Sequence, residues 1–350
     1  MIDQIKSYDE HRRRAEKYIL ALNNIYDAAI RQIAKLSAAG KFRDTGDIFS
    51  FSVYPGIEEK VNEVLKKMHS DLLILVSSGI TDEWDYSTRK NDELVKSVFG
   101  PKSFENTRYK RFYNRNENAK AAFLERKING LGLSDRIWNQ VQGFKQEIEL
   151  CIDDALADGR SAARLSQDLR NHLQQPDRLF RRVRSRYGDK LLLSRKAKIF
   201  HPGTGEYRSS YKNSMRVART EVNMAYRTAD YLRWQQLDFV VGFEVRRSNA
   251  GYDCPVCASL AGKYPKDFKF VGWHPQCRCY VVAILCTQRE LEAMNEALLS
   301  GDTSSSLIPR NQIKTVPVAF TKWLNDNADR VKTAKTLPYF LADNKKYINI

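Results

Sequence analysis

The feature that most constrains the fold is a cluster of cysteines and one histidine between positions 254 and 279. It contains four of the chain's six cysteines and one of its five histidines. The first pair, Cys254-Pro-Val-Cys257, has the two-residue spacing that lets both sulfurs face one tetrahedral ion at about 2.3 Å. His274, Cys277 and Cys279 follow in the run His-Pro-Gln-Cys-Arg-Cys. A metal ion on these donors would hold the segment folded without a large core.

Five donors are present for the four positions of a tetrahedral zinc site, so we expect one of His274, Cys277 and Cys279 to stay off the metal. A thiolate-rich set favours a structural zinc site, because catalytic zinc keeps an open position and uses more histidine or carboxylate. Disulfides and inert buried thiols are the alternatives, and a reducing cytoplasm argues against disulfides. We expect Cys151 and Cys286 to be core or boundary thiols, not ligands.

The charge of the chain favours a polyanionic partner. Its formal net charge is +16, which points first to nucleic acid, then to an acidic protein surface and last to a membrane surface. Much of the positive charge lies in a basic segment, residues 178–198, that has Asp189 as its single acid. Its basic residues are Arg178, Arg181, Arg182, Arg184, Arg186, Lys190, Arg195, Lys196 and Lys198. Contact with a DNA backbone and a solvated connector both stay open as interpretations.

The sequence predicts no membrane-spanning segment. Its longest aliphatic run, Leu72-Leu-Ile-Leu-Val76, is far shorter than the about 20 apolar residues that a spanning helix needs. Residues 1–17 are charged and lack the apolar core of a secretory signal. We therefore expect a soluble chain that is made in the cytoplasm and has no membrane partner of its own.

Helical periodicity dominates the first half of the chain, with apolar residues recurring at spacings of three and four. We expect Gly79 to close the second of these helices. Residues 104–130 mix basic and aromatic side chains, which predicts a stacking surface for single strands or, as we favour, a helix with its aromatics in the core. The predicted helices cover residues 1–40, 57–76, 92–99, 134–159 and 161–173.

The second half combines helices with strands. After a turn-rich stretch, where His201 is expected to be a loop residue, a strong helix is predicted over 210–237. It carries a polar rail, a row of polar side chains that could be solvated, could satisfy neighbouring loops or could form a site. Strands are predicted over 239–246 and 280–285, the latter apolar on both sides and so well buried. The rail consists of Arg216, Thr220, Asn223 and Arg227.

The C-terminal part is predicted to be a helix, a linker and an arm. Thr287 and Glu290 have the spacing of a capping box for a helix that ends at Gly301. Residues 301–306 are typical of a flexible linker. A short helix over 320–331 and the aromatic run 337–340 follow, which either dock onto a partner or pack back onto the chain itself.

These patterns predict an α+β fold that is mostly α. A helical N-terminal region would occupy residues 1–185. A small zinc-clipped α+β domain would follow over 186–286. A capping helix, a linker and a C-terminal arm would form 287–350.

Several residues occur in an order found in one known family. The order resembles the phage Mu F-like minor head proteins, the phage head morphogenesis domain of tailed bacteriophages, over about residues 185–285. One departure is Trp273, because many members carry proline before the His-Pro pair, and this change leaves the ligands intact. The matching residues are Arg219-Thr-Glu221, Ala225-Tyr226, Gly242, Asp253, Cys254-Pro-Val-Cys257, Leu260, Gly262 and His274-Pro-Gln-Cys277-Arg-Cys279.

The resemblance implies a virion protein, present in few copies, that acts in head morphogenesis at the portal or inner capsid. Members tend to be encoded beside the portal protein, and some bind the portal and DNA and travel with the genome. The implied partners are the portal protein, the major capsid protein and genomic double-stranded DNA. Arg219, Glu221 and Asp253 are implied as family-motif residues, and no enzymatic activity is expected.

Three other classes are weighed against this expectation. A zinc-dependent nuclease needs a histidine base and a metal held by carboxylates, whereas His274 is expected on zinc and His201 and Asp253 form no recognised nuclease motif. An adapter for toxin delivery is the second, since the family's domain also occurs upstream of toxin domains, yet the segment after Cys286 is short for an enzymatic domain. A zinc-finger DNA-binding regulator would need a recognition helix and a dimerisation device, and neither stands out.

Overall fold

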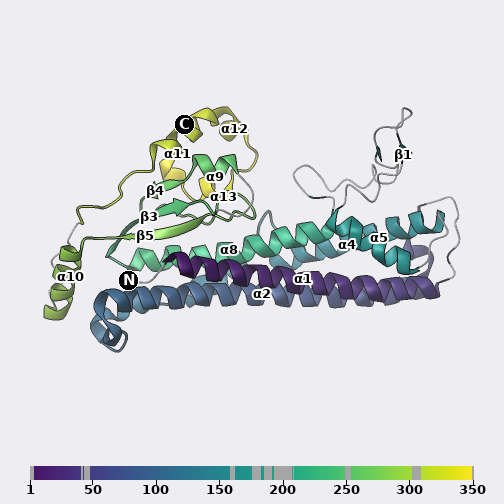
Figure 1. The fold of residues 1–350 in the computed structure, drawn as a ribbon, viewed down its shortest axis with the longest axis horizontal. Helices are drawn as coiled ribbons and strands as arrows, with labels where there is room; N and C mark the ends of the chain where they lie inside the picture. Colours follow the sequence, from purple (N-terminus) through teal and green to yellow (C-terminus); the bar gives the residue numbers. More distant parts are fainter. Residues whose placement is uncertain are drawn as a thin grey trace. The chain divides into compact units, whose positions relative to one another are not determined.

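The computed structural model describes residues 4–40, 42, 48–157, 162–175, 183–184, 191–192, 207, 209–248, 254–301 and 309–348. The fold is mostly helical and contains a small three-stranded antiparallel sheet, as Figure 1 shows. This confirms the mostly α character and the presence of a sheet that the sequence predicted.

The chain forms two compact units, each assembled from separate segments. The first, called the sheet unit, combines Met1–Ala15, Gly79–Leu124 and Thr220–Ile350. The second, called the helical unit, combines Glu16–Ser78 and Glu125–Arg219. These units do not coincide with the three consecutive segments predicted from the sequence.

Most predicted helices are present close to their expected bounds. The α-helices are α1 Gln4–Ala39, α2 Pro55–Phe99, α3 Glu117–Glu125, α4 Leu133–Ala157, α5 Ala162–Gln174, α8 Ser210–Gln236, α9 Pro255–Ser259, α10 Gln288–Ser300, α11 Val318–Asp326, α12 Ala328–Thr333 and α13 Tyr339–Ala342. The 3₁₀ helices are η1 Phe51–Val53, η2 Pro101–Phe104, η3 Thr107–Tyr113 and η4 Lys345–Tyr347. Thr287 and Glu290 form the predicted capping box of α10, and Gly301 closes that helix in the left-handed conformation. Among the described residues, no helix has the length and apolar character needed to cross a membrane.

Helix α2 corrects the prediction of two separate helices, because Gly79 lies inside one continuous helix. Trp84 is fully buried and continues the apolar face. Ser87 and Asn91 then occupy the buried face and donate hydrogen bonds to Asp230 of α8. These polar side chains interrupt the apolar period that the prediction followed. A glycine inside a helix costs only about 1 kcal/mol relative to alanine, so the helix continues through it.

The basic and aromatic stretch forms η2, η3 and α3 instead of a single helix. Tyr109, Phe112 and Phe123 are buried, so the predicted core role is confirmed for these aromatics. Tyr113 is half-buried, and Phe104 has 53% of its surface exposed. The buried rings anchor a segment whose basic side chains lie at the surface.

The sheet has the strand order β4-β3-β5, with both pairs antiparallel. Its strands are β3 Val240–Arg246, β4 Gly262–Tyr264 and β5 Tyr280–Leu285. Strand β4 was not predicted, because three residues are too few for an alternating pattern. The central β3 is confirmed, with Phe239 before it and Val241, Phe243 and Val245 all buried.

Strand β5 is an edge strand, which corrects the expectation that it is well buried. Only Ala283 among its residues is buried, and the others are half-buried. The outer edge is covered by a side chain of α1, since the Ala283 N–H donates to Gln4 Oε1 at 2.7 Å and Gln4 Nε2 donates to the Ala283 carbonyl at 3.4 Å. Tyr8 adds to this cover by stacking on Tyr280. The apolar run thus reflects partial burial on both faces at a covered edge.

The C-terminal segment packs back onto the sheet unit. Phe320, Phe340 and Leu341 are buried in the same core as the strands. The Ile313 N–H donates to the Val241 carbonyl at 3.0 Å. A Cβ atom on Gly242 would lie 2.6 Å from the Ile313 side chain, so this close approach requires glycine. The C-terminal aromatics therefore pack onto the chain itself, which is one of the two alternatives that the sequence left open.

The helical unit contains the predicted amphipathic packing. Val141, Phe144 and Ile148 of α4 are buried at spacings of three and four. Cys151 is buried on the same helix, as expected for a core thiol, and Cys286 is likewise buried in the core of the sheet unit.

Only a small part of the predicted basic segment is described. Two short antiparallel strands occur there, β1 Val183–Arg184 and β2 Leu191–Leu192, with Arg184 opposite Leu191. Apart from Arg184, whose backbone is in β1, the predicted nucleic-acid-binding residues lie outside the described residues. The DNA contact therefore stays a prediction.

Candidate metal centre

The five predicted donors lie together in a donor cluster, which consists of Cys254, Cys257, His274, Cys277 and Cys279. One group contains Cys254, Cys257 and His274, and the other contains Cys257, Cys277 and Cys279. The donor atoms within each group are within 4.8 Å of one another, and Cys257 belongs to both groups. All six cysteines of the chain are free thiols, so the disulfide alternative is not found.

The first two sulfurs are positioned by the short helix α9. Cys254 is its N-cap residue and Pro255 occupies the first turn. The Ala258 N–H donates to the Cys254 carbonyl at 2.9 Å, which closes that turn. Proline has its backbone dihedral fixed for this position and lacks the N–H that would go unused there. The turn brings Cys257 back beside Cys254, as the two-residue spacing predicted.

The ring of His274 is oriented for coordination through Nε2. Its Nδ1 lies 2.8 Å from the Pro275 carbonyl oxygen, which can only accept, so Nδ1 carries the proton. The unprotonated Nε2 lies 3.3 Å from Cys254 Sγ and 3.2 Å from Cys257 Sγ. A backbone carbonyl commonly fixes the tautomer of a metal-binding histidine in this way.

The spacing of the donors fits a tetrahedral site. Cys257 Sγ lies 3.9 Å from Cys277 Sγ and 3.2 Å from His274 Nε2. Four sulfur or nitrogen ligands at ordinary bond lengths around one tetrahedral ion would be about 3.4–3.8 Å apart. The side chains of Cys254, Cys257, His274 and one of the last two cysteines could therefore hold a metal ion after small adjustments.

Hydrogen bonds among the sulfurs of the donor cluster shift the pKa values of Cys257 and Cys277 in opposite directions. Hydrogen bonds from Cys257 and Cys279, helped by the Arg227 guanidinium, hold the pKa of Cys277 well below its ordinary value. The same hydrogen bond to Cys277 raises the pKa of Cys257, which acts as the donor. These directions favour ionisation at Cys277. Because metal ligation requires further thiolates, binding would release protons.

The polar rail of α8 satisfies the backbone of the loop that carries His274, Cys277 and Cys279. Thr220 Oγ1 accepts from the Gln276 N–H at 3.1 Å, and Asn223 Nδ2 donates to the Cys277 carbonyl at 3.3 Å. Of the three interpretations of the rail, hydrogen bonding to a neighbouring loop is therefore the one found for these residues. Arg216, its fourth residue, is half-buried.

Arg227 makes the most contacts with this loop. Its guanidinium donates to the carbonyl oxygens of Val271, Cys277 and Cys279 at 3.0, 2.8 and 2.6 Å. It is almost fully buried, and it lies over the Phe270 ring with its Cζ 5.4 Å from the centroid. A buried guanidinium that joins three carbonyls fixes the direction in which the two cysteines leave the backbone.

The close approach of Arg227 explains a glycine in the loop. Gly272 has a φ of +126°, and a Cβ there would lie 2.8 Å from Arg227 Nη1 and 3.2 Å from the Cys277 Cβ. Neither Arg227 nor Gly272 was singled out from the sequence as a residue of the metal centre. The available signal was the spacing of Thr220, Asn223 and Arg227, which places them on one face of a helix.

Trp273, which departs from the family pattern, fills the core beneath the loop. Its ring contacts those of Phe270, Tyr264 and Phe340, with centroids 4.8, 5.6 and 5.3 Å apart. Trp273 is 2% exposed. The tryptophan therefore links the loop to the C-terminal segment through aromatic packing.

The family-motif residues have other surroundings. Arg219 is buried and pairs with Glu16 in the helical unit, with Nη2 3.0 Å from Oε2. Glu221 is buried in the sheet unit, and Asp253 lies outside the described residues. The contacts seen for Arg219 are those of a side chain that holds helices together.

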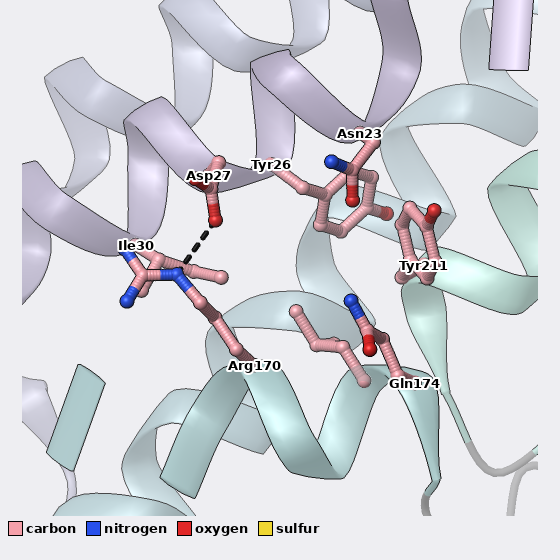
Figure 2. A pocket seen from close by; sticks show the side chains of 8 residues that line it. Asn23, Tyr26, Asp27, Ile30, Arg170, Gln174 and Tyr211 are labelled. Atoms are coloured by element: carbon pink, nitrogen blue, oxygen red, sulfur yellow. Dashed lines mark hydrogen bonds and ion pairs between the residues drawn. The ribbon is translucent and has the colours of Figure 1, made fainter. Parts of the chain in front are cut away.

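The helical unit contains a small hollow at the surface of α1, α5 and α8 (Figure 2). Its charged side chains already pair, since Arg170 Nε donates to Asp27 Oδ1 at 2.6 Å and Arg31 Nη2 donates to Asp27 Oδ2 at 2.8 Å. Because these charges already compensate one another, the hollow offers a charged ligand little electrostatic attraction. The hollow is lined by Asn23, Tyr26, Asp27, Ile30, Arg170, Leu173, Gln174 and Tyr211.

Comparisons with known proteins do not add to this description. A scan against protein-family models found no match for the chain, and neither did searches among curated proteins and solved structures.

Proposed function

We propose that the chain is a zinc-containing minor head protein of a tailed phage or prophage. It would act in head morphogenesis at the portal or the inner capsid and be present in few copies per virion. The observation that carries the proposal is the assembly of the donor cluster on helix α8. The cysteines and histidine that resemble the Mu F-like pattern converge there, and the residues after Arg219 supply the rail that holds their loop.

Zinc is the proposed ion because of the ligand chemistry. Thiolates and one imidazole favour zinc over magnesium, calcium or manganese, which prefer oxygen ligands. Four protein ligands leave no open position for water, so the role is structural. Bound zinc would stabilise the loop between α9 and β5, where regular secondary structure is sparse.

Metal analysis of the purified chain tests this part of the proposal. We expect about one zinc per chain, the stoichiometry of a single tetrahedral site. A chain that is folded and contains no metal after expression with zinc would remove the cofactor from the proposal.

Genomic double-stranded DNA and the portal or major capsid protein are the proposed partners. The net charge of +16 supports a polyanionic partner. Replacing Arg181, Arg182, Arg184 and Arg186 by glutamine should weaken DNA retention, and the salt dependence should become shallower because fewer counterions are released. Unchanged retention would assign the basic segment to a connector or a protein contact.

The biological assignment is tested on particles. Mass spectrometry of purified virions and of head assembly intermediates should detect the chain at a small fraction of the major capsid protein. Its absence from both kinds of particle would overturn the proposed function, whatever metal the isolated chain contains.

A further inference from the structure

A buried histidine lies next to the polar rail in the sheet unit. His11 of α1 is 2% exposed, and its ring stacks on that of Tyr226 in α8 with centroids 4.0 Å apart. Its Nδ1 lies 2.6 Å from Glu83 Oε2 of α2, and its Nε2 lies 3.0 Å from Asn223 Oδ1. Both ring nitrogens therefore have a polar partner, and the identity of each partner determines where the protons are.

The partner of Nε2 can only accept in this arrangement. Asn223 Nδ2 faces the Cys277 carbonyl oxygen at 3.3 Å, and a carbonyl has no proton to donate. The amide nitrogen of Asn223 must therefore point to Cys277, and its oxygen must point to His11. The nitrogen Nε2 of His11 consequently carries a proton.

The partner of Nδ1 is a carboxylate. Glu83 is fully buried, and its other oxygen, Oε1, accepts from Arg14 Nε at 2.5 Å. A guanidinium is always charged and stabilises the ionised form of the carboxyl group. Nδ1 of His11 therefore donates to Glu83, so both ring nitrogens carry protons and the ring is an imidazolium.

Charged side chains surround the ring, and two of the cations among them pair with buried carboxylates. Arg14 of α1 and Glu83 of α2 pair directly, and the stacked Tyr226 is followed on α8 by Arg227. The Tyr226 hydroxyl accepts a hydrogen bond from Lys90, which pairs with Asp230. A buried imidazolium between a carboxylate and an amide oxygen is thus part of a connected polar network.

We propose that His11 is a positioning residue of the metal centre. Its imidazolium fixes the amide of Asn223, and that amide holds the carbonyl of Cys277 in the donor cluster. Glu83, His11, Asn223 and Cys277 then form one chain of hydrogen bonds from α2 to the metal ligands. The inference rests on the proposed metal centre and adds that the first helix of the chain controls how tightly the ion is held.

The first test is zinc affinity, measured by competition of the full-length zinc-loaded protein with a chromogenic chelator. Asn223→Asp keeps an acceptor for His11 and removes the donor to Cys277, so we expect about tenfold weaker binding or more. His11→Phe keeps the stacking on Tyr226 and removes both donors, and it should weaken binding to a similar extent. His69→Phe, the same substitution in the helical unit, is the matched control and should leave the affinity unchanged.

The second test measures the ring itself. Nitrogen NMR of the histidine-labelled full-length protein at neutral pH should show both ring nitrogens of His11 protonated. In the Glu83→Gln variant, Nδ1 should be unprotonated. A neutral His11 ring in the unmodified protein would overturn the inference. This measurement remains decisive if His11→Phe fails to fold.

The outcomes also separate this inference from the proposed function. Zinc affinity that is unchanged in both Asn223→Asp and His11→Phe would overturn the positioning role and leave the minor head protein assignment standing. A folded unmodified protein without zinc would overturn the positioning role together with the metal centre. The particle analysis would then decide the biological assignment alone.

Discussion

The donor cluster of the sheet unit and the α4 core of the helical unit are stabilised in different ways. In α4, Val141, Phe144 and Ile148 are buried on one repeated apolar face. Around the donor cluster, Cys257 and Arg227 each meet several partners at once. A periodic apolar face spreads its stabilisation over many residues, whereas a convergent polar site depends on a few.

The buried acids of the two units differ in the number of residues that donate hydrogen bonds to them. Asp230 of the sheet unit accepts hydrogen bonds from Ser87, Lys90 and Asn91, so its charge has several partners. Glu147 of the helical unit accepts from the backbone and side chain of one residue, Ser210, at the start of α8. Burial raises the pKa of Glu147 to about 8. Glu147, with fewer hydrogen-bond donors around it, is therefore the acid that burial drives toward its protonated form.

The largest expected effect would come from the residue shared by both donor groups. Cys257→Ser should remove the bound zinc and strongly lower the urea midpoint of the sheet unit, since structural zinc contributes about 10–16 kcal/mol on binding. Metal analysis and urea unfolding would measure both changes. Cys286→Ala is the control, because this buried thiol is outside the donor cluster and its replacement should leave zinc in place. A Cys257→Ser protein with a full zinc content would contradict the donor assignment.

A smaller effect is expected at the buried acid of the sheet unit. Asp230→Ala leaves Lys90 buried without its carboxylate partner and should cost about 3–5 kcal/mol of unfolding free energy. The matched control is Asp238→Ala, because Asp238 pairs with Arg111 at an exposed position and such a pair contributes about 0–1 kcal/mol. Urea titrations of both variants measure the difference. Equal losses would mean that burial does not distinguish the two ion pairs.

In the helical unit, the buried acid Glu147 should make the free energy of unfolding depend on pH. The pKa of Glu147 rises from 4.5 to about 8, and burial lowers that of His172 from 6.5 to about 3. The folded state keeps a proton on Glu147 that the unfolded state releases, so this group's contribution falls as pH rises from 4.5 to 8. Above pH 6.5, His172 is mostly neutral in both states and no longer offsets that fall.

Glu147→Gln should therefore flatten the stability profile between pH 6.5 and 8, where the unmodified protein loses about 2 kcal/mol. Urea unfolding at several pH values within this window provides the measurement. Glu59→Gln changes an exposed carboxylate of the same unit and should leave the profile unaltered. An unmodified protein with constant stability across this window would show that Glu147 is ionised in the folded state.

The smallest expected effect is a gain in the sheet unit. Gln276 has a φ of +61°, a left-handed conformation that glycine adopts without strain. Gln276→Gly keeps the backbone N–H that donates to Thr220 and should stabilise the protein by a few tenths to about 1 kcal/mol. Asn129→Gly, at φ +51° in the helical unit, should give a smaller gain, because asparagine tolerates this conformation better than glutamine, and it should not alter zinc affinity. A destabilised Gln276→Gly protein would show that the glutamine side chain outweighs the backbone strain.

The sequence alone determined the residue types of the donor cluster and the main helices. The spacing of Cys254, Cys257 and the later donors predicted their convergence, because each close pair lies on one short turn. The apolar period of α1, α4 and α8 predicted their extent, and the pair Thr287 and Glu290 predicted the start of α10. These features depend on neighbours within a few residues, so a local pattern is sufficient to identify them.

Only the tertiary structure decided the function of the polar residues between those patterns. The sequence predicted two helices on either side of Ser87 and Asn91, and only the structure shows that both side chains donate to Asp230 of α8 within one continuous helix. The polar rail was likewise open to several interpretations until the structure placed the loop of Cys277 against it. Strand β5 was predicted to be well buried, but it lies at an edge of the sheet. A buried polar side chain is stable only with a partner, and that partner comes from a distant part of the chain that no local pattern identifies.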